Sequence, residues 1–155
     1  MFAQTNSKGR QGTSLDAGPF QVRFAVSGQP RLEEYRLRYR AFVDEHGWEA
    51  AQTGPDGLEC DAFDQFSCSA LLIDAASGEA AACQRLILPD WLPRGLVANV
   101  EREYRPDTDL PALDFRRLRP EAWAEVSRLA IAPEFRCGSA GANKRAIVTI
   151  TRYGL

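Results

Sequence analysis

The chain has 155 residues, of which 45% are hydrophobic and 26% charged, and its formal net charge is -2. This length and composition are typical of one globular domain, and the small net charge gives no electrostatic argument for nucleic-acid binding. No apolar run is long enough to span a membrane and no secretion signal is visible, so we expect a cytoplasmic protein.

Residues 1–19 are polar and rich in glycine and serine. This composition is typical of a disordered arm, because it cannot bury enough apolar surface to offset the entropy of ordering. We therefore expect residues 1–19 to be disordered and residues 20–155 to form the domain.

The cysteines and the single histidine, His46, argue against metal chemistry. The cysteines are scattered and form no C-x-x-C pair, so we expect no metal site. A histidine-activated nucleophile would have to use His46, at the end of a predicted helix, and we do not expect one. Without a secretion signal, cysteines are more often small buried hydrophobic residues than disulfide partners. The sequence places them at Cys60, Cys68, Cys83 and Cys137.

A strand and a helix open the predicted domain. Residues 20–26 alternate apolar and polar, which predicts a half-buried strand. Pro30 begins a predicted helix that ends before Gly47. Its predicted apolar face consists of Leu32, Tyr35, Tyr39, Phe42 and Val43. The arginines at 36, 38 and 40 lie elsewhere on the helix, which is typical of a solvated face.

A long irregular segment, residues 48–64, follows the helix and ends in three acids set among apolar residues. Loops of this length are often functional. Residues 67–74 and 80–88 then predict an antiparallel hairpin. Arg85 lies inside its second strand, and a buried guanidinium needs a carboxylate or phosphate, which Asp61 or Asp64 can supply.

The stretch 123–133 organises the rest of the chain. Apolar residues surround Glu125 and Arg128, as in a strand buried on both faces. Buried charges are costly unless they are paired or directed at a ligand. A regular strand would direct these two side chains to opposite faces, whereas a bulge would bring both to one face, and bulges recur beside active sites. Pairing of each charge with a loop at a strand end is the alternative that the residues leave open.

A glycine-containing basic turn, residues 135–145, follows this strand. Residues 146–153 are apolar and β-branched, and their period leaves helix or strand open; we favour a helix because of their position after the strand.

This order of elements resembles the GNAT acyltransferase superfamily. More narrowly, it is similar to the acyl-homoserine-lactone (autoinducer) synthases and to the acyltransferases associated with the PEP-CTERM/exosortase system. The matching motifs are residues 35–43 with Trp48, Asp61-x-x-Asp64, residues 84–89 and residues 125–131.

The resemblance implies an α+β, sandwich-like GNAT fold with a mixed, mostly antiparallel central sheet flanked by helices. It also implies further strands after residue 155, so we expect the chain to be C-terminally truncated.

The resemblance also implies which residues surround the amine substrate. In autoinducer synthases, the segment matching Arg38, Phe42 and Trp48 folds over the amine substrate, S-adenosylmethionine. The matching acids and arginine form an ion-pair cluster that shapes the substrate pocket. In this sequence they are Asp61, Asp64 and Arg85.

Glu125 and Arg128 match the catalytic pair on the bulged strand of these relatives, which implies that Glu125 is the base acting on the amine. The strand and the basic turn would bind the acyl donor, through Leu129, Ile131, Arg136, Gly138 and Gly141. The turn only partly matches the superfamily's phosphate loop, Arg/Gln-x-x-Gly-x-Gly/Ala, which normally directs backbone N–H groups at a pyrophosphate. This degeneracy favours a carrier-protein phosphopantetheine over coenzyme A.

The resemblance therefore implies an N-acyltransferase that moves a fatty acyl group from an acyl carrier protein or coenzyme A thioester to a small-molecule amine, with no bound cofactor. Residues 90–93 and 135–136 favour the exosortase-associated type. Phe42 and Trp48 instead favour the autoinducer synthases, with S-adenosylmethionine as co-substrate. The alternatives are a catalytically silent GNAT-like module and an unrelated α+β domain whose ion pairs are structural.

Overall fold

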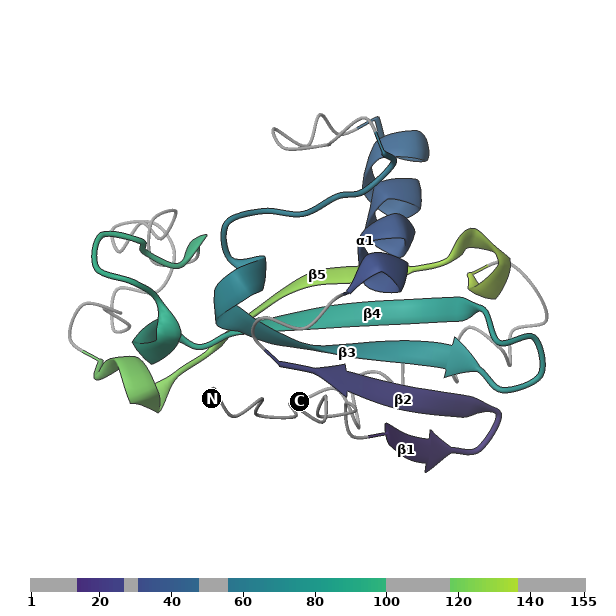
Figure 1. Cartoon of the computed structure of the whole chain (residues 1–155), viewed down its shortest axis with the longest axis horizontal. Coiled ribbons are helices and arrows are strands. Elements are labelled where there is room, and N and C mark those ends of the chain that lie inside the picture. Colours follow the sequence, from purple (N-terminus) through teal and green to yellow (C-terminus); the bar gives the residue numbers. More distant parts are fainter. Residues whose placement is uncertain (1–13, 27–30, 48–55, 100–117, 137–155) are drawn as a thin grey trace, which may run out of the picture.

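A computed structural model describes residues 14–26, 31–47, 56–99 and 118–136. Within these ranges the protein is a five-stranded antiparallel sheet with one α-helix on one face (Figure 1). The strands lie side by side in chain order, so each is the neighbour of the next. They are β1 (Ser14–Ala17), β2 (Phe20–Ala25), β3 (Ser67–Asp74), β4 (Ala80–Ile87) and β5 (Glu125–Ile131). The predicted α+β class and the predicted hairpin of β3 and β4 are confirmed.

The strand β1 was not predicted. It pairs with β2 through Ser14 opposite Arg23 and Ala17 opposite Phe20. Gly18 adopts a φ of 69° in the turn between them, a conformation that glycine reaches without steric cost. The predicted disordered arm is therefore wrong for residues 14–17, and residues 1–13 lie outside the described part.

The helix α1 (Leu32–Tyr39) continues directly into the π-helical turn η1 (Arg40–Asp44), and Gly47 follows at a φ of 63°. The predicted end of the helix is thus confirmed, but its predicted apolar face is wrong. Leu32 is about half exposed, at 49%. The residues of α1 that point into the protein are instead Glu34, Leu37 and Arg38.

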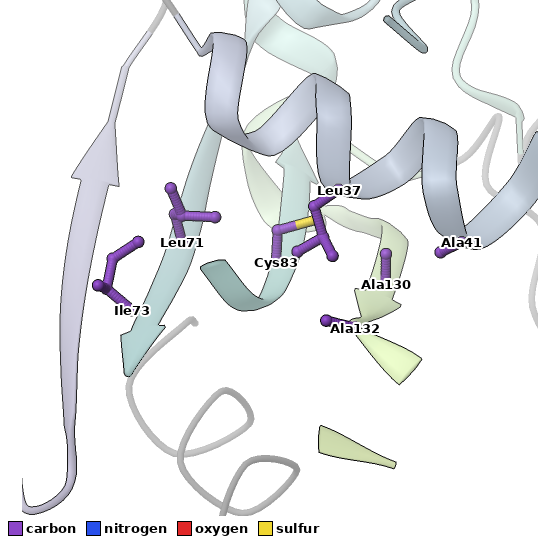
Figure 2. Close-up of a cluster of buried hydrophobic side chains, with 7 residues drawn as sticks. All are labelled: Leu37, Ala41, Leu71, Ile73, Cys83, Ala130 and Ala132. Carbon is purple, nitrogen blue, oxygen red and sulfur yellow. The ribbon is translucent and has the colours of Figure 1, made fainter. Parts of the chain in front are cut away.

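Apolar side chains pack on both faces of the sheet. Beneath α1 and η1, Figure 2 shows a cluster formed by Leu37, Ala41, Leu71, Ile73, Cys83, Ala130 and Ala132. On the opposite face a second cluster consists of Phe20, Val22, Ala70, Leu72, Ala81 and Ala82. The first cluster fixes α1 over β4 and β5, and this position decides which side chains of those strands α1 covers.

The strand β5 is not buried on both faces as the sequence predicted. Val126 and Leu129 point away from α1 and are each 48% exposed. The apolar run around Glu125 and Arg128 therefore indicates a strand but not its burial. No helix in the described ranges is long and apolar enough to cross a membrane.

Candidate active site

A bulge in β5 organises the site. Along β4, Arg85 pairs with Ser127 and Cys83 pairs with Ala130. Gln84 therefore faces two residues, Arg128 and Leu129, which is the pattern of a β-bulge. Arg128 is the one non-glycine residue with a positive φ, 53°, in the described ranges. The sequence spacing of Glu125 and Arg128 required such a bulge if both were to share a face, and the structure has it.

The bulge changes which residues of β5 face α1. Before it, Glu125 and Ser127 share the α1 face because they are two residues apart. After it, Ala130 faces α1 and belongs to the cluster with Leu37. Arg128 joins this side of the sheet, since its guanidinium binds Asp61, which also binds Arg85. Glu125 and Arg128 thus lie on the same face.

Within the described ranges, two arginines are fully buried, Arg38 and Arg85, and they hold Asp64 between them. Arg38 donates from Nη1 and Nη2 to the two carboxylate oxygens of Asp64, at 2.7 and 3.1 Å. Arg85 Nη1 lies 2.9 Å from Asp64 Oδ1. Burial by itself would raise the pKa of Asp64, but the hydrogen bonds and charge of Arg38 and the charge of Arg85 hold that pKa below its usual value. Asp64 is therefore ionised in this site at neutral pH.

Arg38, Arg85 and Asp64 form an ion-pair network, and Glu59 and Asp61 extend it to the bulge at Arg128. Glu59 accepts from Arg38 Nε through one oxygen and from Arg128 Nε, at 3.0 Å, through the other. Asp61 binds Arg85 Nη1 at 2.5 Å and Arg128 Nη2 at 2.9 Å. Since these acids come from the loop before β3, their ion pairs join that loop to α1, β4 and β5.

Glu34 is a fourth carboxylate of the network, and its hydrogen bonds compensate its negative charge less fully than the two arginines compensate that of Asp64. Ser69 donates a hydrogen bond to its Oε2 at 2.6 Å, and Arg38 Nη1 lies 3.3 Å from its Oε1. Burial raises the pKa of Glu34 above its ordinary value, since these interactions only partly compensate the loss of water. Glu34 thus differs from Asp64 in how strongly it holds a proton.

An aromatic ring lies against the guanidinium of Arg38 and another against that of Arg85. The Tyr35 ring centroid lies 5.3 Å from Arg38 Cζ, and the Phe63 ring centroid lies 5.8 Å from Arg85 Cζ. Burial, together with the charge of Asp64, raises the pKa of Tyr35 to about 12, so its phenol is neutral at physiological pH. Arg85 Nη2 is buried and has no hydrogen-bond partner among the described residues, which leaves the two N–H groups of this nitrogen open within that part of the chain.

Glu125 begins β5 opposite Ile87, at the end of the sheet where the acidic loop enters. Its side chain is largely buried, and Asn99 Nδ2 donates to its Oε1 at 3.4 Å. Ser127, two residues further along the strand, accepts a hydrogen bond from Arg85 Nε at 3.1 Å. This contact places Glu125 next to the ion-pair network on the same face of the sheet.

A family model and solved structures match this chain. The family model described as "Acetyltransferase (GNAT) domain" matches residues 37–143, which is more than half of the chain. The chain belongs to the GNAT acetyltransferase domain family. No curated protein matches it significantly in sequence.

Two solved structures are similar to this GNAT domain. The AHL synthase LasI has 17% sequence identity and a TM-score of 0.53 over 86% of this chain and 65% of its own. TofI, in a ternary complex with an inhibitor and MTA, has 26% identity and a TM-score of 0.49 over 71% of this chain and 56% of its own. The chain thus spans less than two thirds of the length of either structure.

The network of the GNAT domain contains every predicted site residue that the sequence assigned to ion pairs. Arg38 also belongs to the network, although helical periodicity assigned it to a solvated face and the resemblance assigned it to the segment over the amine substrate; its side chain is fully buried. Phe42 packs beside the cluster beneath α1. Trp48, Gly138 and Gly141 lie outside the described residues.

The predicted donor-binding residues of the GNAT domain divide between the two faces. Leu129 is exposed on the face opposite α1, and Ile131 packs there against the cluster that contains Val22. Arg136 follows the short helix η6 (Pro133–Phe135) and pairs with Glu45, Nη1 to Oε1 at 2.9 Å. These three residues therefore do not converge with Glu125 in the way that Arg85 and Arg128 do.

Sequence reasoning did not assign four residues of the network: Glu34, Glu59, Ser69 and Ser127. Glu59 had a weak signal, as one of three acids among apolar residues. Glu34 had none, because an acid in the first turn of a helix is common for electrostatic reasons.

Cys60, Cys68 and Cys83 are free thiols, and burial raises the pKa of each. Within the described residues, no group of three or more histidine, cysteine or acidic side chains is arranged to hold a metal ion.

Proposed function

We propose that this GNAT domain transfers an acyl group from a phosphopantetheine thioester to the amine of a small molecule. The observation that carries the proposal is the bulge at Arg128, because it places that guanidinium and Glu125 on one face beside a buried ion-pair network. A carboxylate at the edge of a rigid polar network is a suitable base for an amine.

The proposed reaction forms an amide and releases a thiol. The amine nitrogen attacks the thioester carbonyl carbon, the carbon–sulfur bond breaks, and the thiolate leaves. Glu125 accepts the proton that the amine loses, directly or through one water, and a proton is returned to the thiolate. The oxyanion that forms on the carbonyl oxygen needs N–H donors.

The ion-pair network supplies rigidity to this chemistry. Glu59 and Asp61 fix Arg128 at the bulge, and Arg85 fixes Ser127 two residues from Glu125. Side chains held by several hydrogen bonds preserve the geometry that a reaction needs. The N–H groups of Arg85 Nη2, which find no partner within the described ranges, support a polar substrate atom at this position, since a buried donor without a partner is costly.

For the donor, we propose a phosphopantetheine thioester on an acyl carrier protein in preference to acyl-coenzyme A. The support is the sequence of the turn that contains Arg136, Gly138 and Gly141, which only partly matches a pyrophosphate-binding loop. Leu129 and Ile131 are proposed to contact the donor through the backbone of β5, because their side chains lie on the face opposite α1.

For the acceptor, we propose two candidates. Residues 90–93 and 135–136 support an amine of the exosortase-associated acyltransferases. S-adenosylmethionine, the amine of the autoinducer synthases, is supported by the contacts among Arg38, Asp64 and Arg85, because the resemblance to that branch assigned these residues to its substrate pocket.

The test is release of free thiol from a panel of acyl thioesters, on carrier protein and on coenzyme A, with and without candidate amines. Thiol release that depends on an amine supports an N-acyltransferase, and formation of an acyl-homoserine lactone from S-adenosylmethionine would select the second acceptor. If no amine raises thiol release above the rate of spontaneous hydrolysis, the proposed function is wrong.

A further inference from the structure

Two ion pairs join the end of the helix to the segment after β5. Arg136 binds Glu45 at two points, Nη1 to Oε1 at 2.9 Å and Nη2 to Oε2 at 2.5 Å. Arg40 Nη2 lies 2.7 Å from each carboxylate oxygen of Glu134. We call these two pairs the clasp. Each pair takes one residue from the end of the helix and one from the segment 134–136.

The π-helical turn η1 brings both helix residues of the clasp to one side. In an α-helix, residues five apart point about 140° away from each other. In η1, Glu45 N donates to Arg40 O at 3.1 Å, which is the i to i+5 bond of a π-turn. This bond aligns Arg40 and Glu45, so that one can bind Glu134 while the other binds Arg136. Such turns are frequent at functional sites.

The Arg136 guanidinium is fully engaged along the edges that recognise anions. Glu45 occupies the fork between Nη1 and Nη2, and Nε donates to the Ile131 carbonyl oxygen at 2.6 Å. A phosphate binds arginine through the same two-point geometry as a carboxylate. Arg136 therefore cannot bind a phosphate through this fork while Glu45 holds it.

The pair is exposed enough to be displaced. The side chains of Arg136 and Glu45 are 28% and 34% exposed, and exposed ion pairs contribute little to stability. The phosphate of the donor is negatively charged, as a carboxylate is, and its oxygens can accept from the same two guanidinium nitrogens. We propose that Glu45 competes with the donor's phosphate for Arg136 and so determines donor affinity. This inference rests on the proposed function, in which Arg136 binds the donor.

Glu45 is thereby a specificity-determining residue that sequence motifs do not identify. It lies at the end of the helix that carries Arg38 and Phe42, so the donor's phosphate and the amine side of the site are connected through one element. The competition affects donors that carry a phosphate and leaves the pantetheine arm unaffected.

The test is calorimetric titration of the full chain with 4′-phosphopantetheine and with pantetheine, which lacks the phosphate. Glu45→Gln should bind phosphopantetheine about two- to fivefold more tightly than the wild type, as expected for loss of an exposed ion pair. Its affinity for pantetheine should be unchanged. Glu134→Gln is the matched control, because it breaks the other pair of the clasp and leaves Arg136 bound to Glu45; its phosphopantetheine affinity should stay within about 1.5-fold of the wild type.

Two results would overturn the inference in distinguishable ways. If the wild type prefers phosphopantetheine to pantetheine but Glu45→Gln binds it no more tightly, Glu45 does not compete and the proposed donor site stands. If the wild type and Arg136→Met both bind the two compounds equally, Arg136 is not a phosphate ligand, and the proposed donor site fails together with the inference.

Discussion

Arg38 and Asp64 form a two-point ion pair inside the protein, with N–O distances of 2.7 and 3.1 Å. Neither side chain has appreciable contact with solvent. Taking two charges out of water is costly, and the cost is offset here because each group has a second partner: Glu59 for Arg38 and Arg85 for Asp64. The network is therefore a unit in which the loss of one member leaves buried charges with fewer partners.

Removal of one guanidinium from this unit should be strongly destabilising. Arg85→Met keeps an apolar side chain of similar length but leaves Asp64 with fewer partners and reduces the hydrogen bonding of Asp61. Breaking a buried ion pair in this way costs about 3–5 kcal/mol. Urea unfolding monitored by circular dichroism measures the loss.

Arg23→Met is the matched control for this substitution, because Arg23 forms an exposed ion pair with Glu33 at 2.9 Å. Exposed pairs contribute about 0–1 kcal/mol, so this variant should remain close to the wild type. Equal unfolding free energies for the two variants would contradict the assignment of Arg85 to a buried network.

Glu34 should give the stability a measurable pH dependence. Its pKa in the folded protein is raised above the ordinary value of 4.5. As pH rises from 4.5 to the folded pKa, the unfolded chain loses a proton that the folded protein retains, so the contribution of Glu34 to stability decreases. Glu34→Gln cannot lose this proton. The unfolding free energy of Glu34→Gln minus that of the wild type should therefore increase with pH across this interval and then level off.

The lowered pKa of Asp64 changes the stability in the opposite direction. Its contribution to the free energy of unfolding is present above pH 3.8, the ordinary pKa of the group, and is lost as pH falls towards the lowered pKa. Asp64 is present in both proteins, so its effect largely cancels in the difference. Urea titrations at several pH values measure this difference. A difference that is constant, or that decreases as pH rises, would show that Glu34 is not held in its neutral form by burial.

The backbone at the bulge provides a separate test. Arg128 has a φ of 53°, which costs an L-residue about 1–2 kcal/mol and costs glycine little. Arg128→Gly and Arg128→Ala both remove the ion pairs to Glu59 and Asp61. The glycine variant should therefore be the more stable of the two, by about 1 kcal/mol in chemical denaturation.

The same two substitutions at Ser127, which lacks a positive φ, provide the comparison. There the alanine variant should be the more stable, because glycine weakens a strand interior. If alanine is the better residue at both positions, β5 does not have the bulge at Arg128.

The pairing of Arg85 with Asp61 and Asp64 could be predicted from sequence, because a guanidinium inside a strand requires carboxylates. The bulge could be predicted only conditionally: because Glu125 and Arg128 are an odd number of residues apart, their side chains share a face only if the strand has a bulge. Residues 14–17 were missed as a strand because so short a segment among polar residues carries almost no hydrophobic period. Its partner β2 provides the hydrogen bonds that the local sequence does not specify.

The inward face of the helix could not be predicted from its period. The tyrosines and Leu32 define an apolar stripe, yet Glu34 and Arg38 are buried beside Leu37. The acids that make this burial possible, Glu59 and Asp64, lie in the loop that follows, and Glu59 N donates to Tyr35 O at 3.1 Å where that loop meets α1. A tertiary partner thus overrides the local pattern, and a single sequence does not reveal such a partner.

The central claim is that Glu125 is the base that deprotonates the amine. The most direct measurement is amine-dependent thiol release by Glu125→Gln compared with the wild type, under conditions in which both have the same circular dichroism spectrum and melting temperature. We expect the rate to fall by about 100-fold or more, because the amide keeps the shape of the side chain but cannot accept the proton. A rate close to that of the wild type would contradict the role of Glu125.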